Sequence, residues 1–505
     1  MMKQVYNPYL PLYEYVPDGE PRVFDGRLYV YGSHDIAGGV YYCPGDYVVW
    51  SAPVEDLTDW RYEGISYRKT QDPSNSEGKR MLWAPDVVRG VDGRYYLYYC
   101  LDFLPEIGVA VSDHPAGPFE FLGHVKYSPH LMNGKKLQEH LPFDPGVLVD
   151  DDGRVFLYYG FSSLTDFQFP DRETLIKMGA GEDHIERIES MRGLKPSEGG
   201  MVVELESDMV TMKEAPKLCI PGGRIAGGTS FEGHAFYEAS SMRKVNGKYY
   251  YIYSSQLSHE LCYAVSEYPD RGFVYGGTIV SNGDVGYQGR TKPVNMLGNN
   301  HGSIVQVGDH WYVFYHRQTH GTEFSRQGCA ERIKILPDGR IPQVEITSCG
   351  LNGGPLIASG EYSAAIACHL TSENNLVKPN YFDPRVRQEL PYIYEEPSGE
   401  SEQDHIQYIA NVTNGVSFGF KYFAFEDVRK LEIRLRGDAD GQLFVYLDSL
   451  DSNPISATNV QVQGSEWTTV PFQLAPVNGV HALYFKFGGE GVLQVKNIVF
   501  GQDRK

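Results

Sequence analysis

The sequence predicts an all-β protein, with a five-bladed β-propeller over residues 1–350 and a β-sandwich over residues 363–505. Aromatic residues make up 13% of the chain, and 55 glycines and 30 prolines provide many turns. One hairpin pattern recurs five times in the first 350 residues, whereas short alternating strands without that pattern follow a glycine-rich segment near residue 350. These observations favour two β-rich domains.

The propeller is predicted from the spacing of the hairpins. In each, an apolar run, a tight turn and an aromatic strand follow one another, and Asp-Gly or Asn-Gly between alternating strands signals a hairpin. The hairpins recur roughly every 60 residues, as expected for four-stranded blades. A large sandwich or barrel is the alternative, but neither needs a recurring motif. The hairpins span 23–35, 87–100, 147–160, 242–255 and 304–317, with turn glycines Gly26, Gly93, Gly153, Gly247 and Gly308.

One interval is longer than the others, which implies an insertion between residues 161 and 230. Within it, residues 181–194 are expected to form a short surface helix. This insertion is a candidate for shaping specificity.

Every repeat also carries an ionisable residue seven to nine positions before its turn glycine: Asp18, Asp86, Asp144, Glu238 and His301. The innermost strands of a propeller line its central channel, so these side chains are expected to converge at one mouth of that channel. The simpler alternative is that acidic residues precede strands as ordinary turn residues. Five occurrences in five repeats, in apolar contexts, favour convergence.

Converging carboxylates have a characteristic chemistry. Like charges in a poorly solvated funnel either separate in pKa or bind a cation. Two carboxyl groups with separated pKa values can serve as the acid and the base of glycoside hydrolysis. Histidine, carboxylates and water could also hold Ca²⁺ on the axis. No organic cofactor is predicted, because the glycine-rich stretch 222–228 lacks the Lys-Ser/Thr of a phosphate-binding loop.

Charge and cysteine content limit the partners and the compartment. The net charge of −20 argues against nucleic acid and anionic membranes as partners. Seven scattered cysteines without a CxxC pair indicate reduced thiols, and the N-terminus has no apolar signal segment. We therefore expect a cytoplasmic protein, or a secreted one if a signal peptide has been removed. Oligomeric state is not predicted.

The stretch EASSMRKVNGKYY (238–250) resembles the general-acid motif of glycoside hydrolase family 43, with Ser240 where the family has proline. The resemblance covers about residues 5–345. It implies a five-bladed propeller that hydrolyses glycosides with inversion, and it makes Glu238 the general acid. Lys244, Gly247 and Tyr249 fall in register with that motif.

Further segments carry the same resemblance. FDPGVLVDDDGRVFLYYG implies that Asp144 modulates the pKa of the acid, WAPDVV that Trp83 and Asp86 line the substrate pocket, and NNHGSIV that His301 binds a central metal ion. The family's base is an Asp-Pro near the N-terminus, where this chain reads PDGEP (17–21). Ungapped spacing points to Asp18 as the base, and a gapped alignment points to Glu20.

Four other residues are candidates for substrate binding. His34 and Asp35 end the first hairpin, and Phe231 precedes the acid strand as a stacking ring or as core packing. Arg317 ends the fifth hairpin. It either bonds a sugar hydroxyl or the modulator, or caps a blade by pairing with an acidic residue.

The last 40 residues or so resemble the final strands of family 6 carbohydrate-binding modules, which implies a jelly-roll sandwich. Trp467 and Tyr484 are the aromatic candidates for sugar binding, although both could be core residues. Binding and scaffolding are both open for this domain.

Taken together, the resemblance implies removal of α-L-arabinofuranosyl or β-D-xylosyl residues from plant polysaccharides or oligosaccharides. The two catalytic carboxyl groups of an inverting enzyme are expected about 6.5–9.5 Å apart. The alternatives are a retaining fructan-cleaving furanosidase, a non-catalytic carbohydrate-binding propeller and a protein scaffold.

Overall fold

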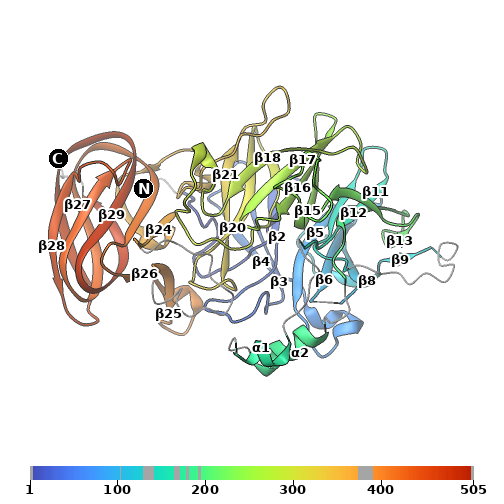
Figure 1. Cartoon of the computed structure of the whole chain (residues 1–505), viewed down its shortest axis with the longest axis horizontal. Coiled ribbons are helices and arrows are strands. Elements are labelled where there is room, and N and C mark those ends of the chain that lie inside the picture. The colour runs from blue at the N-terminus through green and yellow to red at the C-terminus, as the bar shows by residue number, and fades with distance from the viewer. Residues whose placement is uncertain are drawn as a thin grey trace.

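The five hairpin repeats fold as five separate sheets, and each repeat supplies the first two strands of its sheet (Figure 1). The structure, a computed structural model, describes residues 4–102, 104–128, 141–163, 171–177, 181–190, 195–373 and 390–501. All five turn glycines have a positive φ, between 56° and 86°, which glycine adopts without steric cost. The five-bladed propeller is therefore confirmed.

Three blades are antiparallel four-stranded sheets whose strands pair in chain order. The first contains β1 (Glu20–Phe24), β2 (Arg27–Tyr31), β3 (Tyr47–Pro53) and β4 (Arg61–Tyr67). The second contains β5 (Leu82–Arg89), β6 (Tyr95–Leu101), β7 (Ile107–Ser112) and β8 (Glu120–His124). The fourth contains β15 (Phe236–Val245), β16 (Lys248–Ser255), β17 (Glu260–Ser266) and β18 (Val274–Ser281).

The third and fifth blades depart from this plan. The third has β10 (Gly146–Val149), β11 (Val155–Tyr159), β12 (Gly199–Leu205), β13 (Thr211–Met212) and β14 (Lys217–Pro221), together with β9 (Lys126–Tyr127). The fifth has β19 (Ile304–Val307), β20 (His310–Gln318) and β21 (Arg326–Ile333). The N-terminal segment lies beside β21, where Tyr9 N donates to Gly328 O over 3.2 Å and Ala330 N donates to Asn7 Oδ1 over 2.9 Å.

The ring is held together by apolar contacts between blades. Five buried clusters each combine residues of two neighbouring blades, and together they connect every blade to the next, including the fifth to the first. The strand β6, for example, is buried along its whole length, because both of its faces pack against neighbouring sheets. Aromatic and β-branched strands suit such two-sided packing.

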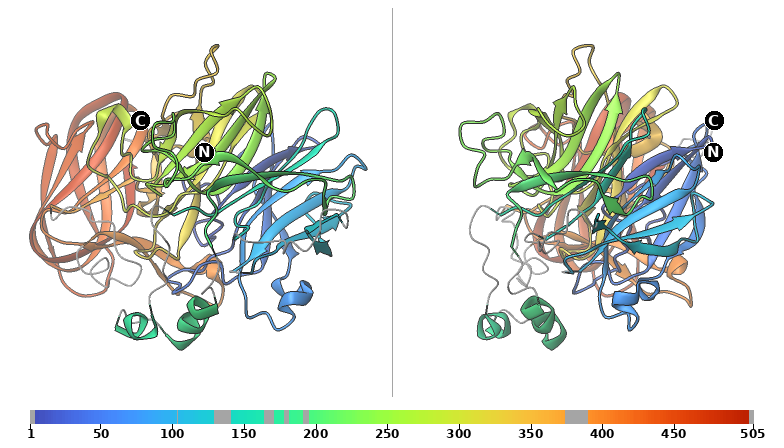
Figure 2. Two further views of the ribbon diagram at one scale, coloured as in Figure 1. Left: turned by 45° about the vertical axis from the view of Figure 1, so that its right-hand side comes forward. Right: turned by 90° about the vertical axis from the view of Figure 1, so that its right-hand side faces the viewer.

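Two helices lie in the long insertion of the third blade, α1 (Arg172–Lys177) and α2 (Glu182–Ser190). They project from one side of the propeller (Figures 1 and 2). The helix expected at 181–194 is confirmed over α2, and residues 191–194 lie outside the described part of the chain. Neither described helix has the length and apolarity that crossing a bilayer requires.

The C-terminal part is a curled β-sheet domain beside the propeller (Figures 1 and 2). Its two long strands pair with each other in two registers, so that Leu431 faces both Phe500 and Phe472 and the sheet folds around one apolar core. Its strands are β22 (Leu356–Ile357), β23 (Gly360–Ser363), β24 (His369–Thr371), β25 (Tyr392–Glu396), β26 (Ile406–Val412), β27 (Ser417–Leu447), β28 (Ser456–Val462) and β29 (Thr468–Gly501). The domain limits 1–350 and 363–505 stay a prediction.

Candidate active site

Four of the five predicted ionisable residues meet where the first strands of the blades begin. Asp18, Asp144 and His301 lie just before β1, β10 and β19, and Glu238 lies near the start of β15. All four side chains are buried. The backbone is unusual here, since Asp18 and Asp144 have φ values of 57° and 48°. Left-handed conformations of non-glycine residues persist only where the surrounding structure imposes them, and they are common at functional sites.

His301 is the centre of the cluster. Its Nδ1 atom lies 3.4 Å from Asp144 Oδ2 and 3.9 Å from Asp18 Oδ1, and its Nε2 atom lies 4.0 Å from Glu20 Oε1. Burial lowers the pKa of the imidazole, but the charges of Asp144 and Asp18 outweigh burial and raise this pKa to about 9. Residues from the first, third and fifth blades therefore meet around one imidazole.

Asp18 is held as an ionised carboxylate. Arg326 Nη1 donates to its Oδ1 atom over 2.8 Å, and His316 Nδ1 lies 3.3 Å from the same atom. Burial raises the pKa of Asp18, yet the guanidinium of Arg326 outweighs burial and holds the pKa well below its usual range. An ionised carboxylate can accept a proton from water, as a general base must.

Glu238 has the opposite electrostatic setting. Burial, with the added charge of Asp144, raises the pKa of Glu238 to about 8. The strand β15 bulges on both sides of Glu238, and the next residue, Ala239, has a φ of 67°. Such bulges re-aim side chains at the ends of strands. Near neutral pH the carboxyl group of Glu238 is therefore protonated and can act as an acid.

Asp144 connects to the acid through the backbone. Its Oδ2 atom accepts a hydrogen bond from Ala239 N over 3.0 Å, one residue beyond Glu238. Burial raises the pKa of Asp144, and the His301 imidazolium opposes this effect. The blades approach closely here, since a Cβ atom added to Gly146 would lie 2.3 Å from Ser240 O. These contacts fix Asp144 against the acid strand.

A second group of charged side chains lies next to this cluster and includes Glu20, the other candidate for the base. Arg243 Nη2 donates to Glu20 Oε2 over 2.6 Å, and Ser241 Oγ donates to the same oxygen over 3.0 Å. Burial raises the pKa of Glu20, so that it is a weaker candidate for the ionised base. Asp18 is the better fit to the base, and Glu20 fits a structural ion pair.

Asp86 does not fit its predicted contact with substrate. It is fully buried, and both of its carboxylate oxygens are taken by Arg22, with Nη2–Oδ1 and Nη2–Oδ2 distances of 2.8 and 2.6 Å. The backbone N–H groups of Val87 and Val147 donate to the two oxygens as well. Since these bonds use its acceptor capacity, we correct the prediction: Asp86 links the first, second and third blades.

The end of the first hairpin contacts the cluster through Arg326, which also donates to Asp18. Both oxygens of Asp35 accept hydrogen bonds from Arg326, with distances of 2.8 and 3.1 Å, and Oδ1 also accepts from Cys43 N. His34 Nδ1 lies 3.0 Å from Asp46 O, and its Nε2 atom lies 4.0 Å from Glu14. Asp35 therefore positions Arg326, and contact of His34 with substrate stays a prediction.

Two further predictions are corrected by burial. Phe231 belongs to the apolar cluster between the third and fourth blades, which supports the core alternative. Arg317 points away from the carboxylates, because its Nε donates to Cys329 Sγ and its Nη1 to Ala367 O. Trp83 packs edge-on against Phe143, the residue before Asp144, with ring centroids 5.1 Å apart, and its contact with substrate stays a prediction.

The sequence reasoning missed Arg326 and chose the wrong member of the pair His316 and Arg317. Consecutive residues of a strand point to opposite faces. His316 therefore faces Asp18, whereas Arg317 faces the C-terminal domain. No local signal identifies Arg326, because it lies 308 positions from Asp18 and outside every hairpin motif.

The lysine and the tyrosine of the acid motif have a structural role. Lys244 Nζ donates to Asp150 Oδ1 over 2.6 Å, and Tyr249 OH donates to Asp150 Oδ2 over 2.5 Å. Asp150 follows the last residue of β10, so these bonds join the third and fourth blades. The motif therefore combines the candidate acid with a clamp between blades.

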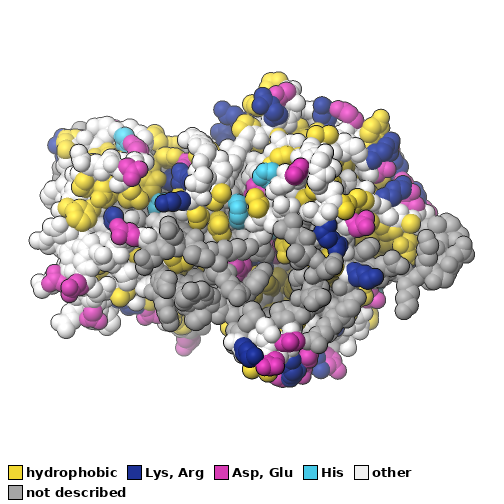
Figure 3. Space-filling model, in the orientation of Figure 1, with side chains coloured by type: hydrophobic (Ala, Val, Ile, Leu, Met, Phe, Trp, Pro, Cys, Tyr) yellow, Lys and Arg dark blue, Asp and Glu magenta, His cyan; other side chains and the backbone are white. Residues whose placement is uncertain are grey.

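The two aromatic candidates of the C-terminal domain are already engaged. Arg436 and Lys496 lie over the Trp467 ring, 4.3 and 5.6 Å from its centroid. Tyr484 is buried against Gly419 and His369. Cations therefore already lie over Trp467, and Tyr484 is buried, while sugar binding by this domain stays a prediction. Acidic and basic side chains are interspersed over the face of the molecule seen in Figure 3.

Comparisons with known proteins show which family this chain matches. Residues 22–341 match the model of a family described as glycosyl hydrolases family 43. A xylosidase/arabinosidase of Thermoclostridium stercorarium is 43% identical over 510 residues, which cover 100% of both chains. The crystal structure of a GH43 enzyme from Xanthomonas citri covers 70% of this chain and 96% of its own, with 24% identity and a TM-score of 0.50. A compost-metagenome β-xylosidase/α-arabinofuranosidase, solved with xylotriose in a calcium-free form, covers 68% and 98%, with 27% identity and a TM-score of 0.49.

Proposed function

The chain belongs to glycosyl hydrolase family 43, and from this premise we propose that it removes terminal or side-chain pentose residues from plant polysaccharides or oligosaccharides by an inverting mechanism. The sugar residues that we propose it removes are α-L-arabinofuranosyl and β-D-xylosyl groups. The name of the Thermoclostridium stercorarium relative, a xylosidase/arabinosidase that matches this chain over the whole of both sequences, supports this substrate class.

One observation carries the mechanism: two carboxyl groups of one buried cluster have opposite protonation states. The pKa of Glu238 is raised to about 8, whereas the pKa of Asp18 is held well below its usual range. Glycoside hydrolysis needs such a pair, because one group must deliver a proton while the other removes one. Neither state requires the substrate to be present.

In the proposed reaction, Glu238 donates its proton to the glycosidic oxygen as the bond from that oxygen to the anomeric carbon breaks. Water attacks the anomeric carbon from the opposite face, and Asp18 accepts a proton from that water. The sugar leaves with inverted configuration, Glu238 is ionised, and Asp18 is neutral until the two groups exchange protons with solvent. Asp144 favours the protonated acid by its charge and holds the acid strand through Ala239 N.

A cation on the propeller axis is also part of the proposal. Glu20 Oε1 is buried without a hydrogen-bond partner among the described residues, and it lies 4.0 Å from His301 Nε2. These two atoms fit a hydrated hard cation such as Ca²⁺, which takes oxygen ligands and water. When bound, the ion would supply positive charge next to the carboxylate cluster. His301 would then present a neutral Nε2 atom in place of the imidazolium.

The test is hydrolysis of aryl α-L-arabinofuranoside and aryl β-D-xyloside by the wild type and by Glu238→Ala. We expect cleavage of at least one substrate and a loss of at least about 10²-fold in the variant, the usual cost of removing a general acid. Proton NMR of the first-formed sugar then gives its anomeric configuration. A retained configuration would point to a furanosidase of the retaining type, and binding without cleavage would point to a carbohydrate-binding propeller.

A further inference from the structure

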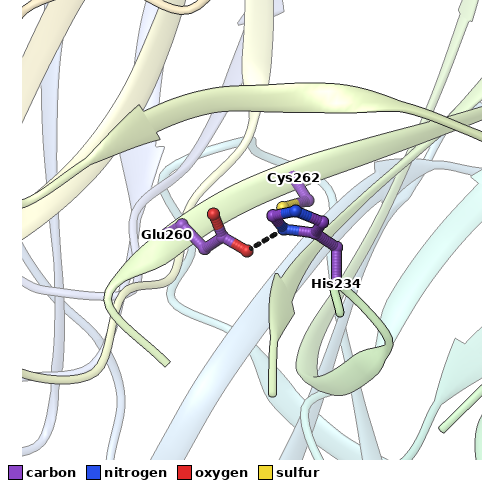
Figure 4. Close-up of side chains that lie close together, drawn as sticks. All are labelled: His234, Glu260 and Cys262. Carbon is purple, nitrogen blue, oxygen red and sulfur yellow. Dashed lines mark hydrogen bonds and ion pairs between the residues drawn. The ribbon is translucent and has the colours of Figure 1, made fainter. Parts of the chain in front are cut away.

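A second cluster of metal-ligating side chains lies on the fourth blade, apart from the carboxylates of the candidate active site. His234, Glu260 and Cys262 place one potential ligand atom each within 4.8 Å of the others (Figure 4). Glu260 and Cys262 are two positions apart on β17, so their side chains lie on the same face of the strand. His234 comes from the loop before β15, and its ring points toward both residues.

We propose that His234, Glu260 and Cys262 form a binding site for Zn²⁺ or a similar borderline divalent cation. An imidazole, a carboxylate and a thiolate are the ligand types that zinc takes, and a water molecule would complete four-fold coordination. The hard cations Ca²⁺ and Mg²⁺ are disfavoured by the sulfur ligand. The site is distinct from the proposed axial cation, which involves His301 and Glu20.

The distances require only a small adjustment. His234 Nδ1 lies 2.6 Å from Glu260 Oε1. Ligand atoms around a tetrahedral zinc ion with bonds of about 2.0–2.3 Å lie roughly 3.3–3.7 Å apart. The imidazole and the carboxylate therefore need to separate by about 1 Å. The ion can reach the site from solvent on the side of His234, whose side chain is 36% exposed. The carboxylate and the thiol are buried.

The residues around the cluster are arranged as supports for the ligands. Ser255 Oγ donates to Glu260 Oε1 over 2.5 Å, and Thr278 Oγ1 donates to Oε2 over 2.9 Å. The ring of Tyr275 is stacked on the imidazole of His234, with centroids 4.9 Å apart and an interplanar angle of 8°. Metal ligands are commonly oriented by such outer hydrogen bonds and packing.

Binding would change the protonation of the ligands. Burial raises the pKa of the Cys262 thiol, so the metal-free protein carries a thiol and not a thiolate. When the ion binds, the thiol proton passes to solvent and a sulfur–metal bond forms. The imidazole must likewise present Nδ1 without its proton. The ion would tie β17 to the loop that carries His234. His234 lies four residues before Glu238 in the sequence.

The first experiment uses Co²⁺ as a spectroscopic substitute for Zn²⁺. The full-length protein is freed of metal with a chelator and titrated with Co²⁺ while absorbance is recorded. We expect a near-ultraviolet thiolate-to-cobalt charge-transfer band that saturates at one equivalent and disappears when Zn²⁺ displaces the cobalt. Absence of the band in the wild type would overturn the proposal.

Variants assign the band to these residues. Cys262→Ser and His234→Ala should abolish it, and Cys219→Ser, which removes a thiol on β14, should leave it unchanged. Persistence of the band in Cys262→Ser would overturn the proposal. Glycosidase activity of each variant checks that it is folded, and Glu260→Gln is the second variant if Cys262→Ser does not fold. Zn²⁺ in excess should also raise the Tm of the wild type by about 2–4 °C, with no rise in the variants that lose the band.

Discussion

Arg326 joins two carboxylates of the first blade, donating from Nη1 to Asp18 Oδ1 over 2.8 Å and from Nε to Asp35 Oδ2 over 2.8 Å. All three side chains are buried. A guanidinium in this position keeps Asp18 ionised although burial favours its neutral form. The proposed base therefore depends on a cation that the fifth blade supplies.

Removal of that cation should shift the acidic limb of the pH–rate profile. In Arg326→Met the pKa of Asp18 should rise, because burial would no longer be opposed by the guanidinium. We expect the acidic limb of kcat/KM for an aryl pentoside to move to higher pH. Asp35→Asn is the control, since it leaves the charge of Arg326 in place. An unchanged limb in Arg326→Met would exclude Asp18 as the group responsible for it.

The proposed acid should be needed most for poor leaving groups. Glu238→Gln should lower kcat/KM by about 10²–10⁴-fold for substrates whose leaving group needs a proton. The loss should be much smaller for an aryl glycoside with a strongly acidic phenol, because that leaving group departs without protonation. A Brønsted plot of rate against the pKa of the phenol measures the difference. Equal losses across the series would contradict the role of general acid.

The raised pKa of Glu238 also predicts how stability depends on pH. Its pKa is about 8 in the folded protein and 4.5 in the unfolded reference. The folded state thus binds this proton more tightly, and the stabilisation is complete below about pH 4.5 and is lost as the pH rises through about 8. Between pH 6 and pH 9 the Tm of the wild type should fall by several degrees more than that of Glu238→Gln. Calorimetry at both pH values checks this, and parallel falls would show that the pKa is not raised.

The contact between the two domains contains a buried lysine with two acidic partners. Lys421 Nζ, on β27, lies 3.2 Å from Asp284 Oδ2 and 2.8 Å from Glu345 Oε1, and its side chain is 1% exposed. Lys421→Met would leave Asp284 without its cation and Glu345 with only Arg290, 3.8 Å away, at a cost of about 3–5 kcal/mol. We expect a large fall in Tm, with kcat/KM for small aryl glycosides within about twofold of wild type.

Lys486→Met is the matched control for that variant. Lys486 lies on the other long strand, β29, and forms a partly exposed pair with Glu373. Exposed pairs contribute about 0–1 kcal/mol, so its Tm should stay close to that of the wild type. Similar Tm values for the two variants would mean that the buried contact contributes little.

The clamp between the third and fourth blades should contribute stability without contributing chemistry. Tyr249→Phe removes the 2.5 Å hydrogen bond to Asp150 and should cost about 1–3 kcal/mol, as expected for a bond to a charged group. Urea denaturation measures this loss. The pH–rate profile should keep its shape, and a displaced limb would show instead that the clamp affects the catalytic carboxyl groups.

The fold and the cluster of ionisable residues in the candidate active site were predictable because they depend on local spacing. Turn glycines such as Gly153 and Gly247 fix each hairpin, and a residue seven to nine positions earlier must then lie near the start of the innermost strand. That rule correctly brought Asp18, Asp144 and Glu238 together with His301. It failed for Asp86, because the spacing places a side chain near the axis without showing which partners it meets.

By itself, the sequence determined the number of blades, the position of each hairpin and the set of ionisable residues near the axis, since these follow from turn chemistry and strand periodicity. Only the tertiary structure decided the charge of each carboxyl group, because the deciding partners come from distant parts of the chain. Arg326 lies 308 positions from Asp18, and Arg243 lies 223 positions from Glu20. In a buried site the nearest charge and the loss of solvent set the pKa, and both are properties of the folded ring.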